Sequence, residues 1–162
     1  MRGFTLIELI LYIAIVTLVM SALIPFAWSV IEGGTKSTTD QEVYSNARFL
    51  SEKIKWEIRN AKGINSVSVN SISLQNFNAS KDPTIIDLSA GKMRIKYGTA
   101  IAVELNSTDT TVSNLTFTNN TSVDNKTKNI QFNFTLGSNF AQNRVEYQQS
   151  VTLQSSGEIR SN

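Results

Sequence analysis

The sequence predicts an α+β protein in which a long N-terminal helix packs on an antiparallel β-sheet. Three observations lead to this prediction. Residues 4–31 are almost wholly apolar, and residues 43–61 repeat apolar positions at helical spacing. After Gly63, apolar positions alternate with polar ones, which is typical of strands that have one face in water. The 162 residues suffice for one membrane-spanning segment and one compact domain.

The composition argues against several classes of function. The formal charge is only +2, and the chain has neither cysteine nor histidine. This rules out disulfide frameworks and thiol chemistry, and it removes the commonest general base and metal ligand. The loop Asn119–Asn125, with Asp109 and Asp124, offers oxygen atoms but lacks a calcium-loop pattern. We therefore predict no enzyme activity, no metal site and no cofactor.

The apolar stretch from Phe4 to Ile31 is the dominant feature of the sequence. As a helix it would be about 42 Å long, whereas the hydrocarbon core of a bilayer is about 30 Å thick. A cleaved secretory signal has a shorter apolar run followed by a small-x-small cleavage site, and this stretch matches neither feature. Arg2 at the start indicates a cytoplasmic N-terminus. We expect Pro25 to kink or loosen the helix around Ser21–Pro25.

Glu8 is the one charged residue between Phe4 and Ile31. A carboxylate at the centre of a membrane-spanning helix costs about 2.5–3.5 kcal/mol on insertion scales, so an ionisable residue there indicates function. The alternative is a glutamate that stays near the lipid headgroups, one turn from the end of the helix, with no partner.

The residues Gly3-Phe4-Thr5-Leu6-Ile7-Glu8 resemble the cleavage and methylation motif of type IV pilins and of the pseudopilins of type II secretion. The resemblance implies that residues 1–3 are a leader, that prepilin peptidase cuts between Gly3 and Phe4, and that Phe4 becomes N-methylated. It also implies that Glu8 sets the assembly register by meeting the Phe4 amine of a neighbouring subunit. Pro25 resembles a proline found in many pilin helices.

The same resemblance implies a set of partners and a location. The partners are the prepilin peptidase/methylase, other pilin or pseudopilin subunits, the inner-membrane assembly platform and, before assembly, membrane lipid. The protein would be a single-pass protein of the cytoplasmic membrane and then part of an extracytoplasmic filament. A minor subunit is favoured, because the chain lacks the C-terminal cysteine pair of many major pilins. The alternative is a signal-anchored protein that never leaves the membrane.

Residues 32–62 are predicted to continue the helix in amphipathic form. Gly33-Gly34 is expected to mark a bend or a short non-helical joint, and Ser37–Asp40 offers a cap for a second helical stretch. Phe49 and Trp56 lie off the centre of the apolar stripe and fit either its edges or subunit contacts. Gly63 is the expected terminator. The apolar stripe consists of Val43, Ala47, Leu50, Ile54, Ile58 and Ala61.

Residues 63–162 are predicted to form the antiparallel β domain, on which the amphipathic stripe should pack in the ladle shape of pilins. Gly98-Thr99 predicts a two-residue hairpin, a turn or bulge is expected at Asn70-Ser71, and the tail Ser155–Asn162 is expected to fray. The expected strands cover Val67–Val69, Ile72–Leu74, Thr84–Leu88, Lys92–Tyr97, Ala100–Leu105, Leu115–Phe117, Ile130–Leu136 and Val145–Leu153.

Lys92, Arg94 and Lys96 share one face of a predicted strand, because side chains two residues apart point the same way. This basic stripe supports an alternative function, namely a surface-displayed module that binds DNA or a host surface. The competing interpretation is a solvated face or a protected sheet edge.

Overall fold

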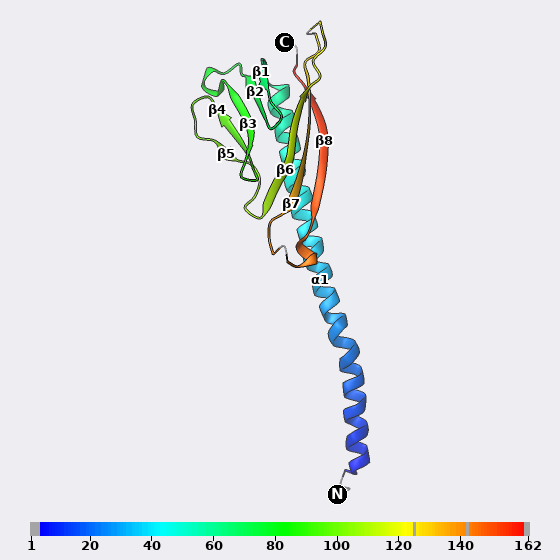
Figure 1. The fold of residues 1–162 in the computed structure, drawn as a ribbon. Coiled ribbons are helices and arrows are strands. Elements are labelled where there is room, and N and C mark those ends of the chain that lie inside the picture. Colours follow the sequence, from blue (N-terminus) through cyan, green and yellow to red (C-terminus); the bar gives the residue numbers. More distant parts are fainter. Residues whose placement is uncertain (1–3, 125, 142, 161–162) are drawn as a thin grey trace. The chain divides into compact units, whose positions relative to one another are not determined.

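The computed structural model describes residues 4–124, 126–141 and 143–160 and has an α+β fold. The chain divides into two compact units, residues 1–38 and 39–162. The helix α1 (Leu6–Arg59) belongs to both units, and all strands lie in the second (Figure 1). The strands are β1 (Gly63–Val67), β2 (Ser71–Gln75), β3 (Thr84–Ser89), β4 (Lys92–Tyr97), β5 (Val103–Glu104), β6 (Thr110–Asn119), β7 (Asn129–Ser138) and β8 (Ser150–Glu158), with short 3₁₀ turns η1 (Ala79–Lys81) and η2 (Val145–Tyr147).

The helix α1 runs without a break through Gly33-Gly34, so the expected joint and the separate cap at Ser37–Asp40 are wrong. Each glycine disfavours helix by only about 1 kcal/mol relative to alanine. A helix that is already nucleated on both sides adds one hydrogen bond per residue, which offsets this cost. The helix ends at Arg59, four residues before the predicted terminator Gly63, which is the first residue of β1.

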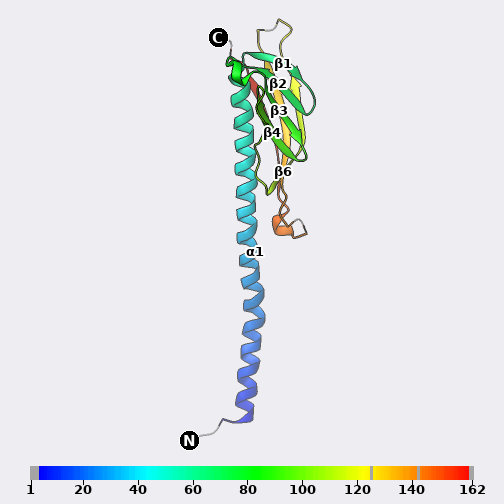
Figure 2. The same ribbon diagram turned by 90° about the vertical axis from the view of Figure 1, so that its left-hand side faces the viewer.

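The strands form two antiparallel sheets where the sequence predicted one. The order is β1-β2-β3-β4-β5 in the first sheet and β6-β7-β8 in the second. Two backbone hydrogen bonds link them, from Phe117 N–H to the Val69 carbonyl (2.9 Å) and from Val112 N–H to the Gly91 carbonyl (2.8 Å). In the second unit, both sheets lie along one side of the helix from Thr39 onward (Figure 2).

The predicted apolar stripe forms the helical side of the core. All six of its residues are buried, and Ala47, Leu50, Ile54 and Ile58 have no exposed surface. Opposite them lie Ile72, Ile86 and Met93 of the first sheet and Ile130, Phe132, Phe134 and Leu136 of the second. The strict alternation of β7 puts its four apolar residues on this one buried face. The amphipathic helix therefore covers both sheets, as the sequence predicted for one.

Several strand limits differ from the predictions. The strand expected at Ala100–Leu105 is reduced to β5, so the turn expected at Gly98-Thr99 is a longer connection, 98–102. Val145 and Tyr147 lie in η2 and not in the last strand. Val69, predicted to lie in a strand, lies in the turn between β1 and β2 and is exposed, and Ser71 of the predicted turn already begins β2. These segments are short, and their apolar residues occur at strand spacing without being part of a buried face.

The β3–β4 connection is a two-residue turn that the sequence analysis missed. Ala90 and Gly91 both have positive φ (50° and 74°), which is the requirement of a type I′ hairpin turn. A Cβ on Gly91 would lie 2.7 Å from Thr111 Cγ2 of β6. Gly91 thus combines the turn with a close approach of the two sheets.

The tail expected to fray from Ser155 to Asn162 is instead ordered sheet as far as Glu158, and residues 161–162 lie outside the described residues. Residues up to Glu158 pair with β7, and Ile159 is buried. Gly157 lets β8 approach the helix closely, because a Cβ there would lie 3.0 Å from Ile58 Cγ2. The polar sequence of this segment hid its contacts with the core, which Gly157 and Ile159 make.

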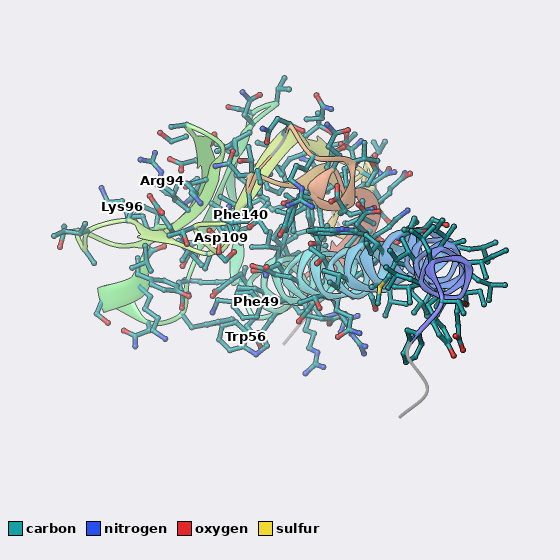
Figure 3. All side chains as sticks on the ribbon, turned by 90° about the horizontal axis from the view of Figure 1, so that it is seen from below. Phe49, Trp56, Arg94, Lys96, Asp109 and Phe140 are labelled. Atoms are coloured by element: carbon teal, nitrogen blue, oxygen red, sulfur yellow. The ribbon has the colours of Figure 1, made fainter. Side chains whose placement is uncertain are left out.

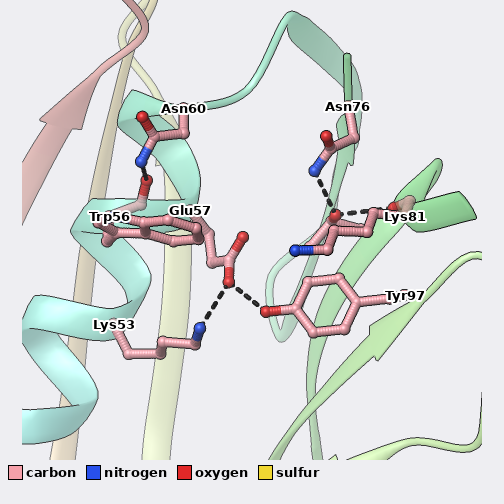
Figure 4. A network of polar contacts seen from close by, with 8 residues as sticks. Lys53, Trp56, Glu57, Asn60, Asn76, Lys81 and Tyr97 are labelled. Atoms are coloured by element: carbon pink, nitrogen blue, oxygen red, sulfur yellow. Dashed lines mark hydrogen bonds and ion pairs between the residues drawn. The ribbon is translucent and has the colours of Figure 1, made fainter. Parts of the chain in front are cut away.

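A buried carboxylate joins the helix to the first sheet (Figure 4). The side chain of Glu57 is only 2% exposed and pairs with Lys53 Nζ at 2.8 Å. The hydroxyl of Tyr97 on β4 donates a hydrogen bond to the same carboxylate oxygen, and Lys81 Nζ lies 5.4 Å from the centre of the Tyr97 ring. Two donors therefore satisfy a charge that would otherwise be costly to bury.

We predict that Gly157→Val lowers the free energy of unfolding by about 1–3 kcal/mol, because the added atoms meet Ile58 in a filled core. Urea unfolding of a fragment that begins at Thr35 measures this. Gly137→Val is the matched control, since a Cβ there would be in ordinary contact at 3.5 Å; it should change stability by less than about 0.5 kcal/mol. Equal effects of the two changes would contradict the close packing at Gly157.

The Glu57 cluster predicts that stability falls at high pH. Burial raises the pKa of Tyr97 above 10.0, and the hydrogen bond with Glu57 raises it further. Burial alone would lower the pKa of Lys53, but its bonds to Glu57 and Tyr97 raise it above 10.5. Both groups thus bind protons more strongly in the folded chain, so their stabilisation is complete below pH 10 and is lost as the pH rises through the folded pKa values.

Urea unfolding of the same fragment at pH 8 and pH 11 tests this effect. Tyr97→Phe should flatten the decline between these pH values and should cost about 1.5–3 kcal/mol at pH 8, because a hydrogen bond to a charged group is lost. Tyr44→Phe is the control, since Tyr44 is 60% exposed. The same decline in all three proteins would show that Tyr97 does not contribute to it.

Candidate functional site

The apolar part of α1 is exposed along its whole length. Leu6, Ile7, Leu18 and Phe26 are each at least 66% exposed, and the most apolar window of this helix has no buried residue. By length and composition α1 can cross a membrane. Apolar surface of this extent is not stable in water, so it requires lipid or other apolar helices around it.

The start of this helix is capped by the motif itself. The N–H of Glu8 lies 3.4 Å from Thr5 Oγ1 and 3.1 Å from the Thr5 carbonyl. Thr5 and Glu8 have the spacing of a capping box, in which a threonine precedes a glutamate by three residues. A carboxylate in the first turn also interacts favourably with the positive end of the helix dipole.

Glu8 is the one charged residue between Phe4 and Ile31, and among the described residues the helix supplies no partner for its carboxylate. The hydroxyls of Thr17, Ser21 and Ser29 donate to carbonyls within the helix, at 2.8 Å for each shortest contact. These bonds satisfy the hydroxyls even in lipid. In the part of the chain that the structure describes, the Glu8 carboxylate has no hydrogen-bond donor and no cation. Its partner must therefore come from elsewhere if the helix enters an apolar environment.

The other predicted residues at this end are placed as follows. Gly3 lies outside the described residues. Phe4 precedes the helix and is 73% exposed, and its ring centre lies 5.9 Å from that of Tyr12, two turns along. Pro25 lies inside α1. The expected kink at Pro25 and the cleavage between Gly3 and Phe4 stay predictions.

The basic stripe on β4 is largely used inside the domain. Arg94 donates two hydrogen bonds to Asp87 on β3, at 2.8 and 2.9 Å. Lys92 Nζ donates to the carbonyls of Ser107 and Thr110 at 2.6 and 3.1 Å. Lys96 has no such partner in residues 4–124, 126–141 and 143–160. One of the three cations is thus left for phosphate, and the DNA hypothesis stays a prediction without further support.

The structure also shows groups that the sequence analysis did not single out. Glu57 and Tyr97 form the cluster described above. The sequence did not predict the burial of Glu57, because this residue lies beside the apolar stripe and is not part of it. Phe49 and Trp56 prove to be about half exposed, so they are not core residues. Among the described residues, no three carboxylates gather in a way that could hold a metal ion.

Comparison with known proteins finds a match at the start of the chain. The long helix on antiparallel sheets is a pilin-like α+β fold. Residues 1–24 match the prokaryotic N-terminal methylation motif. No curated protein and no solved structure matches the chain significantly.

Residues 1–24 therefore carry the N-terminal methylation motif of type IV pilins and pseudopilins, and the fold of the chain is pilin-like. Proteins of this family are structural and not enzymes, which agrees with the composition. The motif implies processing by prepilin peptidase and assembly with pilins, and the apolar helix is consistent with anchoring in the inner membrane before assembly.

Proposed function

We propose that this protein is a minor subunit of a type IV pilus or of a secretion-type pseudopilus. Residues 1–3 are its leader, residues 4–31 its membrane and assembly helix, residues 32–62 the amphipathic continuation, and residues 63–162 the β domain. Before assembly it spans the inner membrane once, with the N-terminus in the cytoplasm. The observation that supports this most is a helix that opens with the methylation motif and whose apolar surface is wholly uncovered.

The mechanism follows from the chemistry of the new N-terminus. Removal of the leader creates a positive amine on Phe4, close to the uncovered Glu8. When apolar helices of neighbouring subunits pack side by side, a Phe4 amine can pair with the Glu8 carboxylate of another copy or subunit. Such a buried pair adds little net stability but penalises other registers, because a mismatched carboxylate would remain unpaired in an apolar core. Glu8 therefore selects the register.

The absence of cysteine in all 162 residues supports the minor assignment, since many major pilins have a C-terminal cysteine pair. The abundance of this chain in filaments tests the minor assignment. Quantitative mass spectrometry of sheared filaments should find this chain at less than about one-tenth of the most abundant subunit. Equal or higher abundance would make it a major subunit.

We predict that Gly3→Leu leaves the leader uncut, because the peptidase needs a small residue before the cleaved bond. Mass spectrometry of the membrane-bound chain should show an N-methylated Phe4 N-terminus in the wild type and an intact Met1 or Arg2 end in the variant. Gly34→Leu is the matched control and should be processed normally, since Gly34 lies in α1, outside the motif. Normal processing of Gly3→Leu would refute the cleavage site.

We predict that Glu8→Gln inserts in the membrane at least as well as the wild type but enters filaments about tenfold less, because the register pair is lost while a charge is removed from lipid. Fractionation of membranes and sheared filaments measures both steps. Ser21→Ala serves as control, because the Ser21 hydroxyl bonds only within the helix. Filament levels of Glu8→Gln equal to those of the control would exclude the register role.

A further inference from the structure

The connection between β7 and β8 carries apolar side chains that the core leaves uncovered. Phe140 and Val145 are 54% and 75% exposed. The ring centres of Phe140 and Tyr147 lie 5.1 Å apart, and the central guanidinium carbon of Arg144 lies 5.7 Å from the centre of the Tyr147 ring. We call the described residues of this connection, 139–141 and 143–149, the β7–β8 loop. The loop thus presents aromatic and aliphatic surface to whatever lies next to it.

The β7–β8 loop lies at the end of the second unit where the chain enters this unit. The N–H of Asn139 donates to the Asp109 carbonyl at 2.7 Å, and Phe140 lies beside Asp109 (Figure 3). Two residues before Asp109, the Ser107 hydroxyl donates to Glu42 Oε1 of α1 at 3.1 Å. Because the second unit begins at residue 39, these contacts place the loop near its first helical turn.

The chain leaves its apolar segment only a short way before this point. Trp28 is 58% exposed, and Glu32 is the first charged residue after the apolar run. Tryptophan is enriched at the level of lipid headgroups, which favours a membrane boundary close to these two residues. From Ile31 to Thr39 the helix advances by about 12 Å, and the headgroup layer takes up about 5–8 Å of this length. Anchoring of α1 in a membrane therefore keeps the β7–β8 loop close to the headgroups.

The composition of the loop fits such an environment. Aromatic rings favour the headgroup level, where one end of the side chain can be apolar and the other wet. The two charged residues of the loop, Arg144 and Glu146, pair with each other, so the loop has no net charge. Burial of apolar surface, and not attraction to anionic lipid, would therefore drive the contact.

Two other occupants fit the loop less well. A nucleic acid needs cations, but Arg144 is already paired with Glu146, and Asp109 beside the loop would repel phosphate. A second copy must first meet the chain by diffusion. The bilayer is instead held next to the loop by the same chain, and such linkage gives a contact a high effective concentration. The membrane is thus the favoured occupant.

We propose that the β7–β8 loop inserts Phe140 and Val145 into the headgroup layer of the membrane that α1 spans, before the subunit enters a filament. This inference rests on the proposed membrane anchoring, and it adds a second lipid contact, made by the β domain. The contact restrains the β domain at the bilayer surface. It explains why two apolar side chains stand uncovered in a connection that is otherwise mostly polar.

Spin labelling of the full chain in phosphatidylcholine vesicles tests the proposal. The chain has no cysteine, so Val145→Cys carries a single nitroxide. Val123→Cys is the matched control, because Val123 is a fully exposed valine in the connection between β6 and β7. Leu18→Cys reports on the apolar half of α1. Power-saturation electron paramagnetic resonance, with oxygen and with a water-soluble nickel complex, measures whether each label lies in lipid or in water.

We expect the label of Val145→Cys to be shielded from the nickel complex and accessible to oxygen, whereas the label of Val123→Cys is open to both. Phe140→Ser should lower the ratio of lipid-bound to water-exposed label in Val145→Cys about tenfold, because the burial of an aromatic ring is lost. Phe77→Ser should leave this ratio unchanged, since Phe77 is 60% exposed but lies outside the loop. Unchanged circular dichroism would show that the variants fold.

Several results would overturn the proposal. These are equal access of the nickel complex to the labels of Val145→Cys and Val123→Cys, or a ratio that Phe140→Ser does not change. Shielding that grows with the protein-to-lipid ratio would assign the loop to a second copy instead. If the label of Leu18→Cys lies in lipid and that of Val145→Cys in water, the inference fails while the membrane anchoring stands. If the label of Leu18→Cys lies in water, the anchoring itself fails.

Discussion

Burial of the apolar stripe Val43–Ala61 is the interaction on which the compact unit depends. Neither sheet has a second layer of its own, so each buries its apolar face against this helix and against the other sheet. An amphipathic face of this kind stabilises helix and sheets together, since neither is stable alone in water. Even the C-terminal strand joins this core, through the bare backbone of Gly157 against Ile58.

The same helix presents the opposite problem in its first half. There the apolar residues face outward on all sides, and nothing within the chain covers them. The hydroxyls of Thr17, Ser21 and Ser29 are satisfied within the helix, whereas the Glu8 carboxylate has no partner among the described residues. A segment built in this way is stable in lipid or among like helices, and the unpaired carboxylate makes one arrangement of those helices better than the others. A lipid bilayer and a bundle of like helices are thus two environments in which this segment is stable.

The two glutamates Glu8 and Glu57 of α1 differ in whether the chain itself supplies a partner for the carboxylate. Glu57 is buried but has two donors of its own chain, so it fixes how the helix sits on β4. The Glu8 carboxylate has no donor among the described residues, so a donor must come from another molecule. The paired carboxylate of Glu57 therefore helps to hold the domain together, and the unpaired carboxylate of Glu8 lies on the surface that we propose for assembly.

The sequence by itself determined the apolar segment with its motif, the buried stripe of the helix and the strand Ile130–Leu136. Each of these is a regular pattern that has one physical cause, namely the side of an element that must leave water. Only the tertiary structure decided the division into two sheets, the Ala90-Gly91 turn and the ordered tail. These depend on contacts between distant residues, such as Gly91 with Thr111 and Gly157 with Ile58, which no local pattern records. For the same reason Lys92 and Arg94 looked free in sequence and are bound in the fold. Phe49 and Trp56, which the sequence placed at the edges of the stripe or at subunit contacts, are about half exposed.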